Sequence, residues 1–140
     1  LLSPALEEEF AAPYVREVIP AVQDDSFAVI YHNCGPNTPK MTPSLSSNGA
    51  AAYHFGDAVQ LTDLLAGMPA DRPVMGNISP SAQFLGGTPD SMTIAVRELL
   101  GKCAGYKNFV LSSGCDIPPA SSWDNIRAFF AASADFYANH

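Results

Sequence analysis

Basic residues are scarce in this sequence. The 140 residues include seven lysines and arginines against 14 aspartates and glutamates, so the formal net charge is −7. A surface with this balance repels phosphate backbones, which argues against a nucleic-acid partner. Long apolar runs are also missing, because no stretch approaches the roughly 18–20 residues needed to cross a bilayer. The acidic residues 7–9 are the opposite of the basic start of a signal peptide, so we expect a cytoplasmic protein with no membrane partner.

Cysteine occurs at only three positions. An odd number of cysteines without a secretory signal argues against a disulfide framework, and leaves thiolate chemistry or metal binding as the alternatives. The remaining composition, 47% hydrophobic and 15% charged, excludes a disordered chain and is typical of a globular one. The length suits one modest core, and the start at Leu1 in place of methionine leads us to expect a fragment of a longer chain.

Short apolar runs alternate with helical patterns along the chain. The runs of strand length cover residues 27–31, 50–55, 72–78 and 108–113, and the first is apolar enough to predict burial on both faces. Helical patterns cover residues 3–22 (capped by Ser3 and kinked at Pro13), 42–48, 58–65, a segment opening at Thr88, and a last one capped by Ser121 or Ser122.

This alternation predicts an α/β fold of parallel strands joined by right-handed crossovers. Four such units amount to half of an eight-unit (β/α)8 TIM barrel, with residues 1–140 as a single partial-barrel domain. An open, doubly wound sheet is the alternative. It is disfavoured because the glycine pair Gly86-Gly87 lacks the spacing of a dinucleotide-binding loop.

Residues that bind soft metals stand where two of the predicted strands end. His32 and Cys34 are two positions apart at the end of the first strand, and Cys115 follows the fourth. Residues i and i+2 of a strand project to the same side, and the strands of a parallel barrel end on one face. Two thiolates and one imidazole with an open fourth position form a known catalytic zinc pattern.

The same residues have a structural interpretation. Free cysteines are often small buried hydrophobes, and a histidine at a strand end can bond a loop carbonyl. Gly35 and Gly114 allow another group to approach the two cysteines closely, which favours the metal site. Cys103 lies on the predicted helix before the fourth strand, and we expect it to be in the core or on the helix surface.

Several segments resemble a known family. They are His32-Asn33-Cys34-Gly35, residues 53–57, residues 74–80, and residues 111–119 followed by residues 124–126. These segments resemble the C-terminal half of the uroporphyrinogen decarboxylase superfamily, and within it they are most similar to the cobamide-dependent methyltransferases of the methylcobalamin:coenzyme M type. The resemblance covers nearly the whole chain.

The resemblance implies that the chain supplies the last four βα units of a barrel. It implies a zinc-dependent methyltransferase that moves a methyl group from a methylated corrinoid protein to a zinc-bound thiol substrate, with His32, Cys34 and Cys115 as zinc ligands. The decarboxylase branch lacks this triad and relies on arginines and an aspartate from the other half of the barrel, so methyl transfer is favoured. A decarboxylase-like lyase and a non-catalytic zinc-binding or docking module remain the alternatives.

Four other residues are candidates for the site. Asp57 and His54 are possible fourth ligands or pocket residues, and Asn77 and Asp116 are expected in the substrate pocket. Each also has a structural interpretation: Asp57 as the N-cap of helix 58–65, His54 as pocket lining, Asn77 in a turn, and Asp116 as a support of the loop before Pro118.

A half barrel leaves the outer flanks of its first and last strands unpaired, and exposed parallel edges seek partners. We therefore expect a homodimer or a second half-barrel chain. Four aromatic residues of the last helix are either a face for a corrin ring or, as their helical spacing favours, part of the core: Trp123, Phe129, Phe130 and Phe136.

Overall fold

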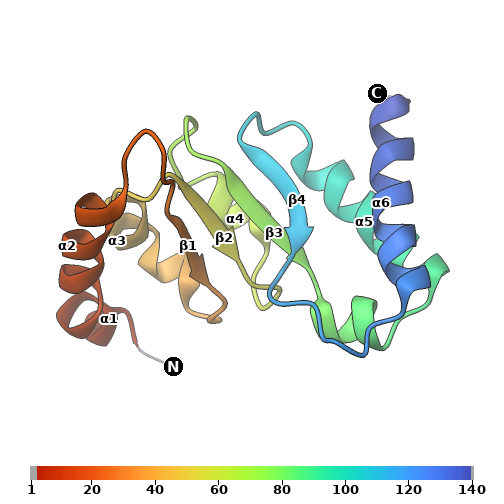
Figure 1. Ribbon diagram of the computed structural model, residues 1–140, viewed down its shortest axis with the longest axis horizontal. Coiled ribbons are helices and arrows are strands. Elements are labelled where there is room, and N and C mark those ends of the chain that lie inside the picture. The colour runs from red at the N-terminus through yellow and green to blue at the C-terminus, as the bar shows by residue number, and fades with distance from the viewer. Residues whose placement is uncertain (1–2, 140) are drawn as a thin grey trace.

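The computed structural model describes residues 3–139; Leu1, Leu2 and His140 lie outside the described residues. Four strands, β1 (Ile30–Asn33), β2 (Ala52–Phe55), β3 (Val74–Ile78) and β4 (Phe109–Ser113), form one sheet in the order β1-β2-β3-β4. All three pairings are parallel. Because the order never reverses, the sheet is not doubly wound, and the predicted α/β half-barrel arrangement is confirmed (Figure 1).

Helices lie beside and behind this sheet (Figure 1). They are α1 (Pro4–Phe10), α2 (Ala12–Val22), α3 (Thr42–Ser46), α4 (Leu61–Leu65), α5 (Pro89–Cys103) and α6 (Trp123–Ala138), with the short turns η1 (Thr38–Met41) and η2 (Pro80–Leu85). Within residues 3–139, none of the helices has the length and apolar character that a membrane span requires.

Three helices begin at the N-cap residues that the sequence predicts. Ser3 accepts a hydrogen bond from the Leu6 amide at 3.3 Å and begins α1. Thr88 and Ser91 form a reciprocal capping box at α5, and Ser122 caps α6. Each cap satisfies amide donors that the first helical turn leaves free, so the local sequence is enough to place these helix starts.

Two helical predictions are wrong in detail. Residues 3–22 form two helices separated at Ala11, because Pro13 lies in the first turn of α2 and has no amide to continue the bonding pattern of α1. Asp57 is not a helix N-cap: α4 begins later, at Leu61, after Gln60 as N-cap.

The predicted burial of the first strand on both faces is also wrong. The strand begins at Ile30, three residues later than predicted, because Phe27 is used in a turn paired with Asp24. Phe27 and Ile30 are 56% and 55% exposed. The apolar run therefore lies at an edge of the sheet, where Phe27 and Ile30 are exposed while Val29 and Tyr31 pack against the core.

The core lies between the sheet and its helices. Tyr53, Phe55 and Val74 point from the sheet into a cluster with α3 and α4, while Ile78 joins a second cluster with α5 and α6. Of the aromatic residues of α6, Phe129 is buried and Phe136 packs against the second cluster, as core residues do. Trp123 and Phe130 are exposed, so the prediction of core placement is wrong for them.

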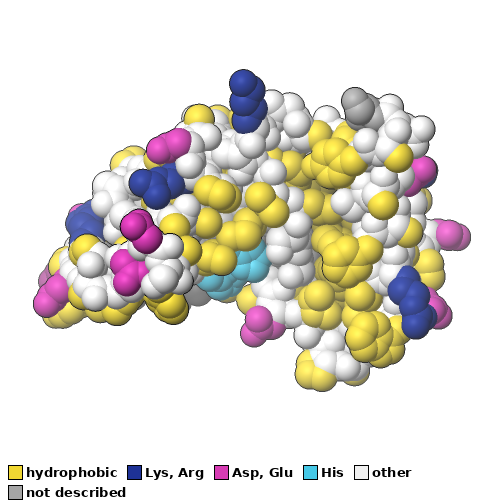
Figure 2. Space-filling view, turned by 45° about the horizontal axis from the view of Figure 1, so that its top comes forward, with side chains coloured by type: hydrophobic (Ala, Val, Ile, Leu, Met, Phe, Trp, Pro, Cys, Tyr) yellow, Lys and Arg dark blue, Asp and Glu magenta, His cyan; other side chains and the backbone are white. Residues whose placement is uncertain are grey.

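The opposite face of the sheet is open. His32, His54, Met75 and Val110 occupy paired positions on the four strands and share this face. Figure 1 shows no helix of the described residues in front of it, and Figure 2 shows exposed hydrophobic side chains around the histidines. In a complete barrel this face is the interior.

Asn125 connects α6 to the segment after β3. Its buried side-chain amide donates to the carbonyls of Gln83, Phe84 and Gly87 at 3.2, 3.2 and 2.9 Å. We expect Asn125→Ala to lower the free energy of unfolding by about 2–4 kcal/mol in urea denaturation, because it leaves buried carbonyls without donors. The control Asn139→Ala, at the exposed end of the same helix, should cost less than about 0.5 kcal/mol. Equal effects would contradict this role of Asn125.

Candidate metal centre

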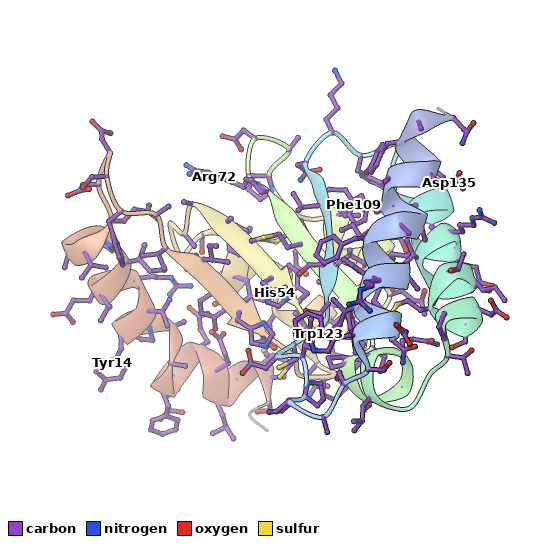
Figure 3. All side chains as sticks on the ribbon, turned by 45° about the vertical axis from the view of Figure 1, so that its right-hand side comes forward. Tyr14, His54, Arg72, Phe109, Trp123 and Asp135 are labelled. Carbon is purple, nitrogen blue, oxygen red and sulfur yellow. The ribbon has the colours of Figure 1, made fainter. Side chains whose placement is uncertain are left out.

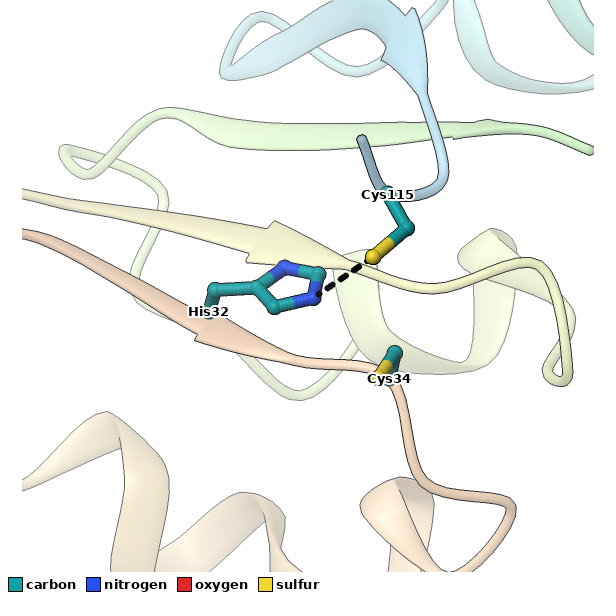
Figure 4. A group of neighbouring side chains, drawn as sticks. All are labelled: His32, Cys34 and Cys115. Carbon is teal, nitrogen blue, oxygen red and sulfur yellow. Dashed lines mark hydrogen bonds between the residues drawn. The ribbon is translucent and has the colours of Figure 1, made fainter. Parts of the chain in front are cut away.

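The structure brings His32, Cys34 and Cys115 together at the carboxyl ends of the strands (Figure 4). Their ligand atoms all lie within 4.8 Å of one another, and His32 Nε2 is 3.6 Å from Cys115 Sγ. His32 belongs to β1, Cys34 follows β1 directly, and Cys115 lies two residues after β4. The convergence expected from the sequence is therefore present in the fold.

Asn33 holds the backbone around Cys34. Its side-chain oxygen accepts hydrogen bonds from the Gly35 amide at 3.0 Å and from the Thr38 hydroxyl at 2.8 Å, which closes the turn after β1. Its carbonyl accepts from the Gly56 amide at 3.1 Å, so the end of β1 stays attached to the end of β2. Cys34 is thus presented by a fixed turn.

Two glycines permit the close contacts that assemble the cluster. A Cβ atom on Gly56 would lie 2.5 Å from the Cβ and 2.6 Å from the Cα of Cys34. A Cβ atom on Gly114 would lie 2.7 Å from the backbone nitrogen of Asp57. Residues 56–57, just after β2, therefore touch the Cys34 turn on one side and the Cys115 segment on the other, and neither contact leaves room for a side chain at the glycine.

His54 lies in the middle of the open face (Figure 3). Its Nε2 is 2.6 Å from the Ser113 carbonyl, so this nitrogen is a donor and is not free to bind a metal. The ring also contacts that of His32, with centroids 4.7 Å apart, because the two histidines are paired across β1 and β2. His54 thus contacts His32 on β1 and also the end of β4, the strand that precedes Cys115.

The remaining candidates lie around the cluster. Asp57 is exposed and packs against Gly114. Asn77 donates to the carbonyls of Gly56 and Val59 at 3.0 and 2.9 Å, which holds the loop after β2. Asp116 is exposed, and its charge acts on His32. Among the described residues, the group with metal-binding spacing contains His32, Cys34 and Cys115 but neither Asp57 nor His54.

Burial affects the titratable groups of His32 and Cys103 in ways that bear on metal binding. Partial desolvation, followed by the neighbouring His54, lowers the pKa of His32, which favours the neutral imidazole that metal binding requires. Cys103 is fully buried in the core beside α4, and burial raises the pKa of its thiol. Cys103 is therefore an inert core residue, in agreement with its prediction as core.

The donor set and its spacing suit a tetrahedral zinc ion. Zinc bonds of about 2.3 Å to sulfur and about 2.0–2.1 Å to nitrogen place a sulfur and a nitrogen ligand about 3.6 Å apart. His32 Nε2 and Cys115 Sγ have this separation. Two soft sulfur ligands and an imidazole favour zinc over magnesium or calcium, which prefer oxygen.

Sequence reasoning missed the residues that support the cluster. Asn33 and Gly56 sit beside candidate ligands in the sequence, but the contacts of Gly56 with Cys34 and with the Asn33 carbonyl join segments that are distant in the chain. An asparagine immediately before a cysteine and ahead of a Gly-Pro pair is a recognisable turn signal. Nothing local indicates that Gly56 faces Cys34.

A non-reversing parallel sheet with polar side chains at the carboxyl ends of its strands defines part of a (β/α)8 barrel of the kind that carries enzyme active sites. The family model described as Uroporphyrinogen decarboxylase (URO-D) matches residues 1–136. The chain belongs to this family.

Individual relatives agree with the family and the fold. Uroporphyrinogen decarboxylase of Prochlorococcus marinus (strain NATL1A) is 29% identical over 134 residues, which are 94% of this chain and 36% of the relative. The protein of the same name from Synechococcus sp. (strain CC9605) is 28% identical with the same coverage. A methyltransferase from Methanosarcina mazei superposes with a TM-score of 0.82 at 22% identity, covering 98% of this chain and 39% of the neighbour. The chain thus spans little more than a third of these proteins.

The proximity of Cys34 and Cys115 can be tested without metal. We expect the metal-free protein, oxidised mildly with diamide, to form a Cys34–Cys115 disulfide, because the two sulfurs lie within 4.8 Å while Cys103 is buried. Peptide mapping by mass spectrometry identifies the pair. Pairing of either residue with Cys103 instead would contradict the arrangement.

Gly114→Ala should slow this cross-link several-fold, since the added Cβ collides with the Asp57 backbone and displaces Cys115. The matched control is Gly101→Ala in α5, where a Cβ meets nothing within 4 Å. If both variants cross-link at the same rate, Gly114 does not place Cys115.

Proposed function

We propose that the protein to which this chain belongs is a zinc-dependent methyltransferase that moves a methyl group from a methylated corrinoid to a thiol. The convergence of His32, Cys34 and Cys115 at spacing suited to a metal is the observation that carries the proposal. Because the chain spans about a third of its relatives, the activity is proposed for the complete barrel, with this half holding the metal.

The ligands have a defined electrostatic role. When bound, zinc would deprotonate a thiol and hold it as a thiolate, the nucleophilic form. The thiolates of Cys34 and Cys115 carry two negative charges, which balance a divalent ion, so a substrate thiolate makes the site anionic and its sulfur electron-rich. Such a thiolate would be the nucleophile toward the methyl carbon of the corrinoid substrate, whose carbon–cobalt bond would break with its electron pair left on cobalt, while His32, Cys34 and Cys115 would hold the sulfur in place.

A decarboxylase is the second candidate, because the curated relatives are named uroporphyrinogen decarboxylase. A decarboxylase must bind the carboxylate that it removes. The cavity beside the cluster is lined by the acidic Glu7, and its lining within the described residues includes no lysine or arginine. The decarboxylase residues implied by the resemblance belong to the other half of the barrel, so the two cysteines and His32 at metal spacing are what favours thiol chemistry here.

The proposal predicts one zinc ion per chain in protein purified without added metal, measured by elemental analysis. Cys34→Ser and Cys115→Ser should each lose the zinc while the far-ultraviolet circular dichroism is unchanged, because the ligands lie outside the core. The zinc-loaded complete protein should then transfer the methyl group of methylcobalamin to 2-mercaptoethanol, followed under anaerobic conditions by the cobalamin absorbance.

Cys103→Ala is the matched control, since Cys103 is a cysteine outside the cluster, and this variant should keep both zinc and activity. Zinc that persists in the two serine variants would contradict the ligand assignment. Zinc without methyl transfer or thiol binding would identify a non-catalytic zinc module. Decarboxylation that survives loss of the triad would identify the second candidate.

We also propose that the open edges of this half barrel are covered by a second copy of the chain or by a second half-barrel chain. The outer sides of β1 and β4 have no strand partner within the described residues. Exposed apolar stripes run along the helices at both ends, with Tyr14 and Val18 on α2 and Trp123 and Phe130 on α6 (Figure 3 shows Tyr14 and Trp123). A corrinoid protein would dock separately, at the barrel mouth.

The second-copy version predicts that the isolated chain sediments as a dimer of twice 14.8 kDa in analytical ultracentrifugation. Val18→Lys should shift it toward monomer, because it places a charge in the apolar stripe of α2. Glu17→Lys, on the adjacent exposed position, is the control and should leave the dimer intact. A monodisperse folded monomer of the unaltered chain would exclude the second-copy version.

A further inference from the structure

A cavity of about 340 Å³ lies directly beside the candidate metal ligands. His32 and Cys34 form one part of its wall, Tyr31 and Met41 contribute apolar surface, and Glu7 of α1 completes it. Its size admits the body of a small thiol whose sulfur reaches the cluster. The charges on its wall therefore bear on which end group, remote from the sulfur, a thiol in this cavity can carry.

Glu7 is a buried carboxylate that has no direct ion pair among the described residues. It is 4% exposed, and its Oε2 accepts one hydrogen bond, from the Ser44 hydroxyl at 3.1 Å. The nearby cation, Arg16, acts on Glu7 through its charge and donates to the Ser44 hydroxyl at 3.2 Å, but its two direct carboxylate contacts, at 2.7 and 3.3 Å, go to Glu8. No lysine or arginine of the described residues forms an ion pair with Glu7. The group of Glu7, Glu8 and Arg16 thus keeps a net negative charge, and it is Glu7 that faces the cavity.

Burial of a carboxylate without a cation is unfavourable, and a ligand that brings a positive charge removes this penalty. A ligand with a sulfonate or carboxylate meets the opposite situation on this part of the wall, where the described residues offer it an anion and no basic side chain. A thiol bound here would therefore be favoured or disfavoured according to the charge at its end remote from sulfur.

We propose that the thiol acceptor is an aminoalkyl thiol, whose sulfur goes to His32, Cys34 and Cys115 and whose ammonium group pairs with Glu7. This inference rests on the proposed function, because it takes the cluster as the site that receives the thiol. Glu7 is a specificity-determining residue in this arrangement, and it takes no part in the methyl transfer itself.

Calorimetric titration of the zinc-loaded protein tests the proposal with thiols that differ only in end group. Cysteamine should bind about tenfold more tightly than 2-mercaptoethanesulfonate, with 2-mercaptoethanol between them. The three-carbon pair, 3-aminopropanethiol and 3-mercaptopropanesulfonate, extends the test to a longer span. Because an ammonium group also acidifies the thiol, the decisive quantity is the ratio of the two affinities compared between the protein and its Glu7 variant.

Glu7→Gln keeps the shape and the acceptor for Ser44 but removes the charge, so the ratio should fall to within about twofold. Glu8→Gln, one residue away on the exposed side of the same helix, is the matched control and should keep the full ratio. Thermal unfolding checks that both variants fold, and the ratio in the unaltered protein is informative even if one does not.

The outcomes separate this inference from the function on which it rests. Equal binding of the two charged thiols by the unaltered protein, or a ratio that Glu7→Gln leaves unchanged, overturns the role of Glu7 while 2-mercaptoethanol binding still supports thiol chemistry. Failure of all three two-carbon thiols to bind the zinc-loaded protein overturns both.

Discussion

The contacts of residues 56–57 hold the candidate site together. These residues follow β2, and they touch the Cys34 turn through Gly56 and the Cys115 segment through the Asp57 backbone against Gly114. His54, just before them, reaches the Ser113 carbonyl at the end of β4. The segments after β1 and β4 thus both contact the segment after β2. The strands β1 and β4 themselves are not paired with each other in the sheet.

The site has a local and a global part. Asn33 fixes the Cys34 turn through bonds within five residues along the chain, which a short stretch of sequence can encode. The approach of Cys115 depends on the parallel register that brings β1 to β4 into one sheet. The buried face of that sheet is held by the helix core, so the same packing that stabilises the fold also aligns the ligands.

Much of the fold could be predicted because its signals are local. Apolar runs, caps at Ser3 and Thr88, and the alternation of strands with helices follow from neighbouring residues. The errors arose where tertiary context decides: the exposure of β1 depends on what lies beside it, and the start of α4 at Leu61 depends on how the loop after β2 is held by Asn77. The cluster could be predicted from strand ends alone, but its supporting contacts join segments that no spacing rule connects.

The candidate ligands belong to the first and the last strand of the sheet. In a flat sheet, strands spaced by about 4.8 Å would hold β1 and β4 about 14 Å apart, yet the ligand atoms lie within 4.8 Å of one another. Side chains and the segments after the strands cover part of this distance, and the curvature that a barrel imposes on its sheet shortens it further. The distance between Cys34 and Cys115 therefore depends on how strongly the sheet is bent. Any partner that alters the bend also alters the distances among the three ligands.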